Sequence, residues 1–191
     1  MQKILLTCSL FFICAFGRAQ FYRSIVAPPA GFTDSLQKIV LDFRFDFHTI
    51  QDSLLEGGGD YETYGSKVTI PGSTDCQIMR FHSVQDTTAA FEATIYQGDN
   101  YDDAVKTYKN FIRMLKRGRM KWIDNSFMSF DGTVKEPNPS LNFSITTLTL
   151  DIIDPRYKDF YAQVELESNM LNWKVDVSFS NKRSDTEGTI N

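Results

Sequence analysis

The sequence predicts a single α+β domain in which two helices pack on a mainly antiparallel sheet. Two segments repeat apolar residues every three or four positions, which is the period of an amphipathic helix. Between and after them, short runs of apolar residues end at Gly, Pro or Asp-Gly turns, as strands joined by tight links do. The expected order over residues 33–180 is therefore helix, three strands, helix, and three or four strands.

The N-terminal residues 1–19 are typical of a cleaved secretory signal peptide. Lys3 supplies a positive start, residues 4–16 form an apolar run, and small residues occupy positions 17 and 19. A run of about thirteen residues is too short to cross a bilayer stably. We therefore expect an exported, soluble chain, periplasmic or extracellular, that begins at Gln20.

Removal of the leader changes both the cysteine count and the charge. Only Cys76 of the three cysteines lies beyond it, which excludes an intrachain disulfide in the exported chain. Cys76 is interpreted as a small buried hydrophobe, with a reactive thiol or an intermolecular bridge as the alternatives. The leader also carries Lys3 and Arg18, so the exported chain is more acidic than the net charge of −4 of the whole sequence. This balance argues against nucleic acid as the main partner.

Residues 20–32 are expected to be an extended lead-in, because Pro28, Pro29 and Gly31 disfavour regular structure. Thr33 or Asp34 can then cap a helix, and apolar residues follow at helical spacing over 36–54. Residues 41–47 also alternate apolar and polar side chains, which is a strand pattern. The helix accounts for the longer stretch and is the prediction adopted.

The expected strands of the first half cover residues 61–70, 76–84 and 89–96, each ended by a turn. A second helix is expected from Asn100, which forms a capping pair with Asp103, to a point near Gly118.

The last third is predicted to be β-rich. Expected strands cover residues 122–130, 141–153, 160–168 and 171–180, the last two as a closing hairpin. The apolar parity of 141–153 changes near Thr147, which predicts a bulge or bend. Residues 181–191 are polar and are expected to form a flexible tail.

The sequence offers no recognisable catalytic constellation. It lacks a G-x-S-x-G motif, and Cys76 and His82 are too far apart along one expected strand to act as a pair. The 24 carboxylates leave a small hydrolase with a dispersed carboxylate site as the alternative function, because glycoside hydrolysis needs two carboxylates in a cleft.

Metal and nucleotide motifs are equally weak. His48 and Asp52 could share a helix face, and the acidic stretch 99–103 has neither the spacing nor the glycine of a calcium loop. The glycines of 57–59 and 65 do not have the spacing of a phosphate-binding loop. We predict no metal site and no cofactor.

The most distinctive cluster is basic. Residues 106–121 contain seven cations and no carboxylate, here called the basic ridge: Lys106, Lys109, Arg113, Lys116, Arg117, Arg119 and Lys121. Such a ridge suits an anionic lipid, an acidic glycan or an acidic protein. The alternative is a solvated helix face whose cations gather near the C-terminus, where the helix dipole favours them, and pair with the acidic segment 34–62.

We therefore expect an exported, soluble binding domain without catalysis of its own, which engages an anionic envelope component through the basic ridge. A docking subunit of an envelope complex is a third possibility. An exposed apolar patch beside the ridge would favour docking, and a concave pocket of carboxylates would favour an enzyme.

Overall fold

The computed structural model describes residues 27–82, 88–169 and 172–181. The expected signal peptide, the first part of the lead-in and nearly all of the tail lie outside these residues. Within them the chain is a small α+β domain built on one large antiparallel sheet.

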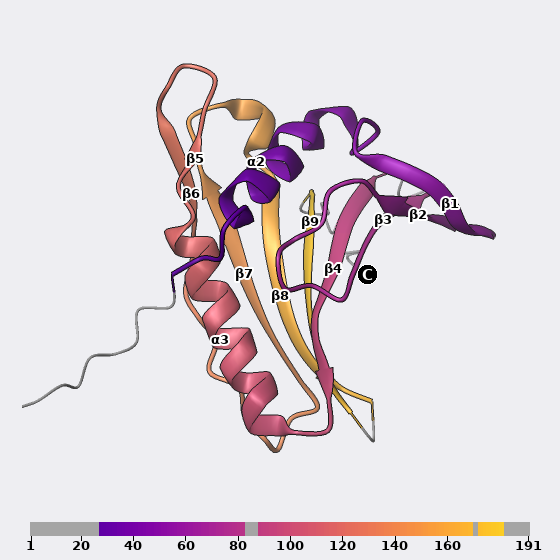
Figure 1. Ribbon diagram of the computed structural model, residues 1–191, viewed down its shortest axis with the longest axis vertical. Helices are drawn as coiled ribbons and strands as arrows, with labels where there is room; N and C mark the ends of the chain where they lie inside the picture. Colours follow the sequence, from indigo (N-terminus) through magenta and orange to yellow (C-terminus); the bar gives the residue numbers. More distant parts are fainter. Residues whose placement is uncertain (1–26, 83–87, 170–171, 182–191) are drawn as a thin grey trace, which may run out of the picture.

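The described elements are two α-helices, two 3₁₀ turns and nine strands (Figure 1). The first half contains α2 (Phe32–Asp42), η1 (Phe43–Phe45), β1 (Gln51–Gly58), β2 (Tyr61–Ser66), β3 (Asp75–Phe81) and β4 (Ala89–Gly98). The second half contains α3 (Tyr101–Arg117), β5 (Met120–Lys121), β6 (Phe127–Asp131), β7 (Phe143–Asp151), η2 (Pro155–Tyr157), β8 (Phe160–Ser168) and β9 (Trp173–Asn181).

The strands lie in the order β1-β2-β3-β4-β9-β8-β7-β6-β5, and every neighbouring pair is antiparallel. The final strand therefore lies in the middle of the sheet, between β4 and β8. This pairing joins the first four strands to the last five.

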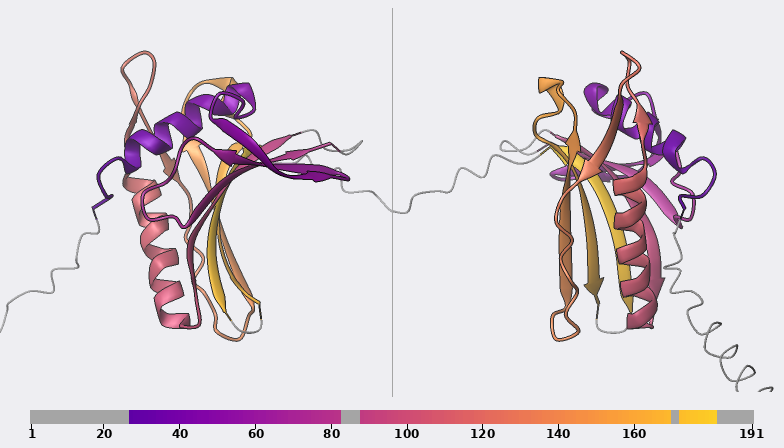
Figure 2. Two further views of the ribbon diagram at one scale, coloured as in Figure 1. Left: turned by 45° about the vertical axis from the view of Figure 1, so that its right-hand side comes forward. Right: turned by 90° about the vertical axis from the view of Figure 1, so that its left-hand side faces the viewer.

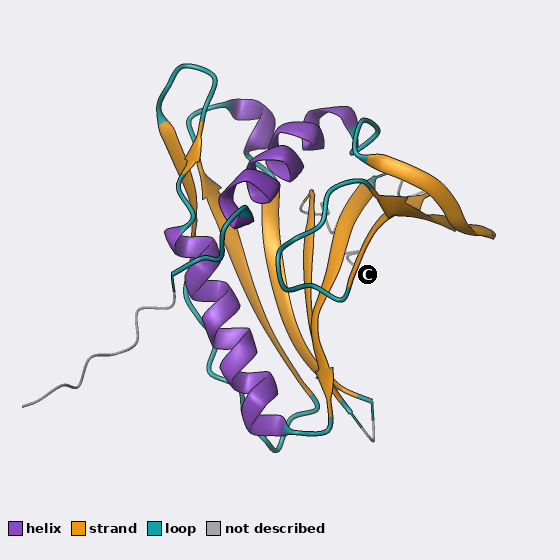
Figure 3. Cartoon of the chain, viewed as in Figure 1, coloured by secondary structure: helices purple, strands orange, loops and turns teal. Residues whose placement is uncertain are grey.

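Both helices lie on the same side of the curved sheet (Figures 2 and 3). No described helix lies on the other face, which is here called the uncovered face. The core lies between the helices and the sheet. It is rich in aromatic residues, with Phe91, Phe160 and Phe179 fully buried on the strands and Phe32 and Phe111 on the helices. Burial of these side chains supplies the main stabilising free energy, because the described chain has no disulfide.

Helix α3 follows its sequence prediction closely. The side chain of Asn100 accepts hydrogen bonds from the backbone N–H groups of Asp102 and Asp103, and the helix ends at Arg117, just before Gly118. Its apolar side packs against β4, β6, β8 and β9. The cap and the apolar period together position the basic side of this helix toward solvent.

The prediction of one long first helix over 36–54 is wrong. Helix α2 ends at Asp42, and after η1 the chain becomes strand β1 from Gln51. The carboxylate of Asp42 accepts hydrogen bonds from the backbone N–H groups of Thr49 and Ile50 at 3.1 and 3.2 Å and from the Thr49 hydroxyl. Asp46 and Phe47 adopt positive φ values of 49° and 59° and reverse the chain. The apolar period continued through this turn because Phe43, Phe47 and Ile50 still point into the core.

Two further boundaries differ from expectation. The stretch expected as one strand over 122–130 is a hairpin in which Met120 pairs with Met128 and Lys121 with Phe127. The strand expected over 61–70 stops at Ser66, after which the Ser66 hydroxyl accepts a hydrogen bond from the N–H of Val68 and donates one to its carbonyl. Short polar side chains that bond to nearby backbone compete with strand pairing in this way.

Strand β7 has no bulge, which was one of the two features, a bulge or a bend, predicted for residues 141–153. Its pairing with β8 is regular from Phe143 to Thr149. The parity change arises because Phe143 lies exposed on the uncovered face, whereas Thr146, Leu148 and Leu150 are buried beneath the helices. Thr146 takes the buried position that an apolar residue would otherwise occupy.

Candidate functional site

The basic ridge begins on α3 and continues into β5. The helix provides Lys106, Lys109, Arg113, Lys116 and Arg117, while Arg119 precedes β5 and Lys121 ends it. The helix runs toward the end of the molecule that carries the β5–β6 hairpin, so the ridge leads to that hairpin (Figure 1).

Three of the helical cations form one narrow exposed stripe. At about 100° per residue, Lys106, Arg113 and Arg117 fall within about 40° of one another around the helix axis. All three are exposed, and they lie opposite the buried residues Tyr108 and Leu115. We call these three residues the exposed stripe. Within the part of the chain that the structure describes, none of them forms an ion pair, although Arg113 donates a hydrogen bond to the Asn110 side chain at 2.8 Å.

The other two helical cations are half-buried and paired. Lys109 forms an ion pair with Glu136, and the Nζ of Lys116 lies 2.8 Å from Oδ1 of Asp131 and donates to the carbonyl of Gly132 at 2.7 Å. The Lys116 ammonium holds the pKa of the Asp131 carboxyl below its usual range. Lys109 and Lys116 therefore tie α3 to the end of β6 and the connection that follows it. Their partners do not come from the acidic segment 34–62.

At the end of the ridge, cations lie beside exposed apolar side chains. The guanidinium of Arg119 stands over the ring of Phe127, 4.8 Å from its centroid. Ile123, in the turn of the same hairpin, and Ile153, after β7, are also exposed. The sequence analysis missed this apolar patch, because its residues come from two segments. The available signal was the spacing of two between the apolar residues Met128 and Phe130, which places Phe127 on the opposite face of the strand.

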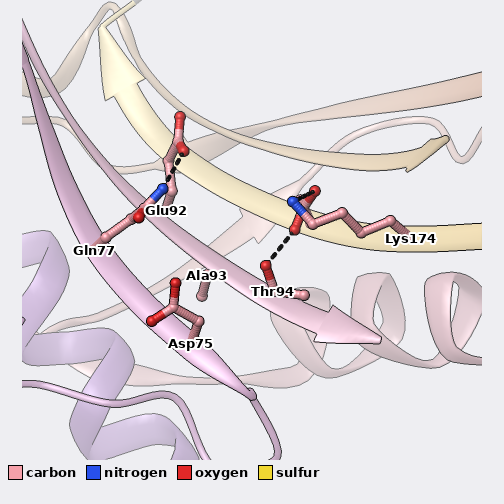
Figure 4. A pocket seen from close by; sticks show the side chains of 7 residues that line it. Asp75, Gln77, Glu92, Ala93, Thr94 and Lys174 are labelled. Atoms are coloured by element: carbon pink, nitrogen blue, oxygen red, sulfur yellow. Dashed lines mark hydrogen bonds and ion pairs between the residues drawn. The ribbon is translucent and has the colours of Figure 1, made fainter. Parts of the chain in front are cut away.

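The uncovered face of the sheet carries a second cluster of charges around a shallow hollow. Figure 4 shows its lining from β3, β4 and β9, namely Asp75, Gln77, Glu92, Ala93, Thr94, Lys174 and Asp176. Sequence analysis did not single out these carboxylates, because they come from strands far apart in the chain.

Most polar groups of this hollow bind one another. The Asp176 carboxylate pairs with the Lys174 ammonium at 2.8 Å and accepts a hydrogen bond from the Thr94 hydroxyl at 2.8 Å. Gln77 donates to Glu92 at 3.3 Å. Burial, together with the charges of Asp176 and Glu165, raises the pKa of Glu92. Such a carboxyl could donate a proton, but the neighbouring Asp176 is held in an internal pair.

The other residues weighed from the sequence do not assemble into a site. Cys76 is buried, as expected, with its sulfur 3.1 Å from the Ser73 hydroxyl. His82 instead contacts Glu62, at 3.0 Å. His48 and Asp52 do not share a helix, because α2 ends before them. The glycines of 57–59 form the end of β1 and the turn that precedes β2.

The described residues contain no group of three or more His, Cys, Asp or Glu side chains arranged to hold a metal ion. None of the described helices is long and apolar enough to cross a membrane.

Comparison of the chain with protein-family models, with curated proteins and with solved structures finds no match. The geometry of the basic ridge and of the uncovered face therefore carries the functional argument.

Proposed function

We propose that this protein is an exported binding domain without catalysis of its own, which engages an anionic component of the cell envelope through its basic ridge. The observation that carries the proposal is the exposed stripe of Lys106, Arg113 and Arg117. These cations face solvent without an ion pair among the described residues, while the paired Lys109 and Lys116 fix the helix to the sheet.

The arrangement suits an extended anionic surface better than a single small anion. Lys106 and Arg117 are eleven residues apart, which corresponds to about 16 Å along a helix. Arg119 and Lys121 carry positive charge beyond the helix to the β5–β6 hairpin, where Lys121 pairs with Phe127. Cations spaced in this way can each approach a different phosphate, carboxylate or sulfate group.

The excess of cations on this side is local. The chain as a whole has a net charge of −4. Other faces therefore repel an anionic surface, and the ridge should set the orientation of approach. Each Lys or Arg near an anionic membrane contributes about 1 kcal/mol, and this contribution falls off within a Debye length of about 8 Å at physiological salt.

The test is binding of the chain beginning at Gln20, which keeps every described element, to vesicles with and without anionic lipid and to a sulfated polysaccharide. The ridge variant is Arg113→Glu with Arg117→Glu. The matched control is Lys38→Glu with Lys67→Glu, which changes the net charge equally at two exposed lysines outside the ridge. Circular dichroism checks that α3 persists in the ridge variant.

We expect binding to anionic vesicles that weakens steeply between about 50 and 500 mM salt. The two charge reversals should weaken the free energy of binding to anionic vesicles by at least about 2 kcal/mol, which is about thirtyfold in affinity. The control variant should lose far less affinity. Equal losses in the two variants, or no binding of the native chain at the lowest salt, would overturn the proposal. Binding to the polysaccharide alone would identify a glycan as the anionic component.

A further inference from the structure

The β5–β6 hairpin and the connection after β7 together present three large apolar side chains to solvent at one end of the molecule. The exposed fractions are 68% for Ile123, 58% for Phe127 and 100% for Ile153. We call these three residues the apolar tip. Exposed aliphatic and aromatic residues gathered at one place are the usual mark of a docking surface.

Strand pairing brings the members of the apolar tip to the same end of the sheet. Ser129 of β6 pairs with Asp151 of β7. Phe127 lies two residues before Ser129, and Ile153 lies two residues after Asp151. Because the strands are antiparallel, both residues lie at the same end of the sheet. Figures 1 and 2 show the β5–β6 loop projecting past α2, with the connection that follows β7 at the same end.

The hairpin is anchored firmly below its tip. Met120 and Met128, which pair across it, are both buried. Trp122 packs edge-on against the buried ring of Tyr157, with ring centroids 5.3 Å apart. The apolar tip is therefore held out from the domain by a packed base.

Cations and carboxylates both lie near the base of the tip. Asp151 and Asp154 flank Ile153, and Asp154 is paired with Arg156. Lys121 is paired with Phe127 across the hairpin, and Arg119 stands over the Phe127 ring. The one carboxylate within the hairpin turn, Asp124, accepts a hydrogen bond from the backbone N–H of Ser126 at 2.8 Å. Cations set behind exposed apolar residues match the layering of an anionic bilayer, in which headgroups overlie hydrocarbon.

We propose that the β5–β6 hairpin inserts the apolar tip into the interfacial region of an anionic lipid bilayer, while Arg119 and Lys121 contact lipid phosphates. This inference rests on the proposed function and names its partner. A sulfated glycan offers nothing to cover Ile123 and Ile153, whereas lipid chains do. A projecting tip also fits a fluid interface, which needs no matching groove.

The direct test places an environment-sensitive dye at the tip. Ile123→Cys is labelled in the chain beginning at Gln20, and Leu55→Cys on the exposed face of β1 is labelled as the control; the native Cys76 is buried. On addition of vesicles containing anionic lipid, the dye at position 123 should shift to the emission of an apolar environment. The dye at position 55 should not shift.

A pair of variants measures what insertion contributes. Ile123→Ser with Ile153→Ser should weaken vesicle binding about tenfold and leave the binding that remains more sensitive to salt. Leu54→Ser with Leu55→Ser removes two exposed leucines from the other end of the sheet and should leave binding unchanged.

The outcomes separate the two proposals. Salt-sensitive vesicle binding without a dye shift at position 123 would overturn insertion while leaving the basic ridge intact. Equal loss in the tip and control variants would also overturn insertion. Absence of vesicle binding would overturn insertion, and binding confined to the sulfated polysaccharide would exclude the bilayer as the partner while leaving the basic ridge intact. Absence of binding to both vesicles and polysaccharide would overturn both proposals.

Discussion

Two buried tyrosines show how a single hydroxyl group changes the stability of this core. The hydroxyl of Tyr108, on α3, lies 2.6 Å from the Thr146 hydroxyl, which in turn accepts a hydrogen bond from the backbone N–H of Lys135. The hydroxyl of Tyr157 is buried and has no hydrogen-bond partner within the described residues. Burial raises the pKa of Tyr157 to about 12, so its phenol stays neutral in ordinary buffers.

This difference predicts opposite responses to the same substitution. Tyr108→Phe should lower the free energy of unfolding by about 1 kcal/mol or more, because the buried Thr146 hydroxyl loses one of its two hydrogen-bond partners and keeps only the N–H of Lys135. Tyr157→Phe should leave it unchanged or raise it, because it removes a polar group that was desolvated without compensation. Urea denaturation of both variants measures the difference. A larger loss in Tyr157→Phe would show that its hydroxyl is satisfied in solution.

At the scale of elements, the end of α2 depends on one side chain. Asp42 is buried, and its carboxylate binds the backbone N–H groups of Thr49 and Ile50 across the turn that leads to β1. The backbone N–H of Phe47 donates a hydrogen bond to the backbone carbonyl of Asp42 at 3.1 Å. Asp42 thus fixes where the helix stops and where the sheet begins.

Asp42→Ala should therefore destabilise the protein by about 1 to 3 kcal/mol, since it leaves buried N–H groups without acceptors. Asp34→Ala, at an exposed position of the first turn of α2, serves as the control and should cost less than 1 kcal/mol. Urea denaturation gives both values, and amide hydrogen exchange should show faster opening of residues 43–50 only in the Asp42 variant. Equal stability of the two variants would contradict this role.

The same turn explains why sequence patterns predicted α3 but not the end of α2. The cap, period and end of α3 are all local, so Asn100 and Gly118 mark it in the sequence. The stop of α2 comes from a contact between Asp42 and Thr49, seven residues on, while the apolar period continues past it. A pattern of apolar residues in the sequence predicts which side chains face the core, but it does not predict the path of the backbone between them.

The sequence patterns did not predict strand β1 or the apolar part of the candidate site. Strand β1 is exposed at every residue after Gln51, so its sequence has no alternation of apolar and polar residues that would predict a strand. The basic ridge was visible because its seven residues are close together in the sequence. The apolar tip was not, because Phe127 and Ile153 meet only through the pairing of β6 with β7.

At the scale of the whole molecule, the sheet separates two differently charged surfaces. The helical side carries the exposed stripe. The uncovered face carries the hollow of Glu92 and Asp176, where Lys174 and Thr94 already bind the Asp176 carboxylate. The strand register places Phe127 on this same face, at the far edge of the sheet from the hollow. Membrane engagement should therefore use the end of the domain that carries the apolar tip, with the hollow on β3, β4 and β9 outside the contact.

Binding of an anionic bilayer through the basic ridge and the apolar tip is tested most directly by amide hydrogen exchange. The measurement uses the chain beginning at Gln20, with and without anionic vesicles. We predict slower exchange on binding in the β5–β6 hairpin around Ile123 and near Arg117 at the end of α3, with little change around Glu92 and Asp176. Slower exchange centred on β4 and β9 around the hollow, or an unchanged hairpin in chains that are bound to vesicles, would contradict it.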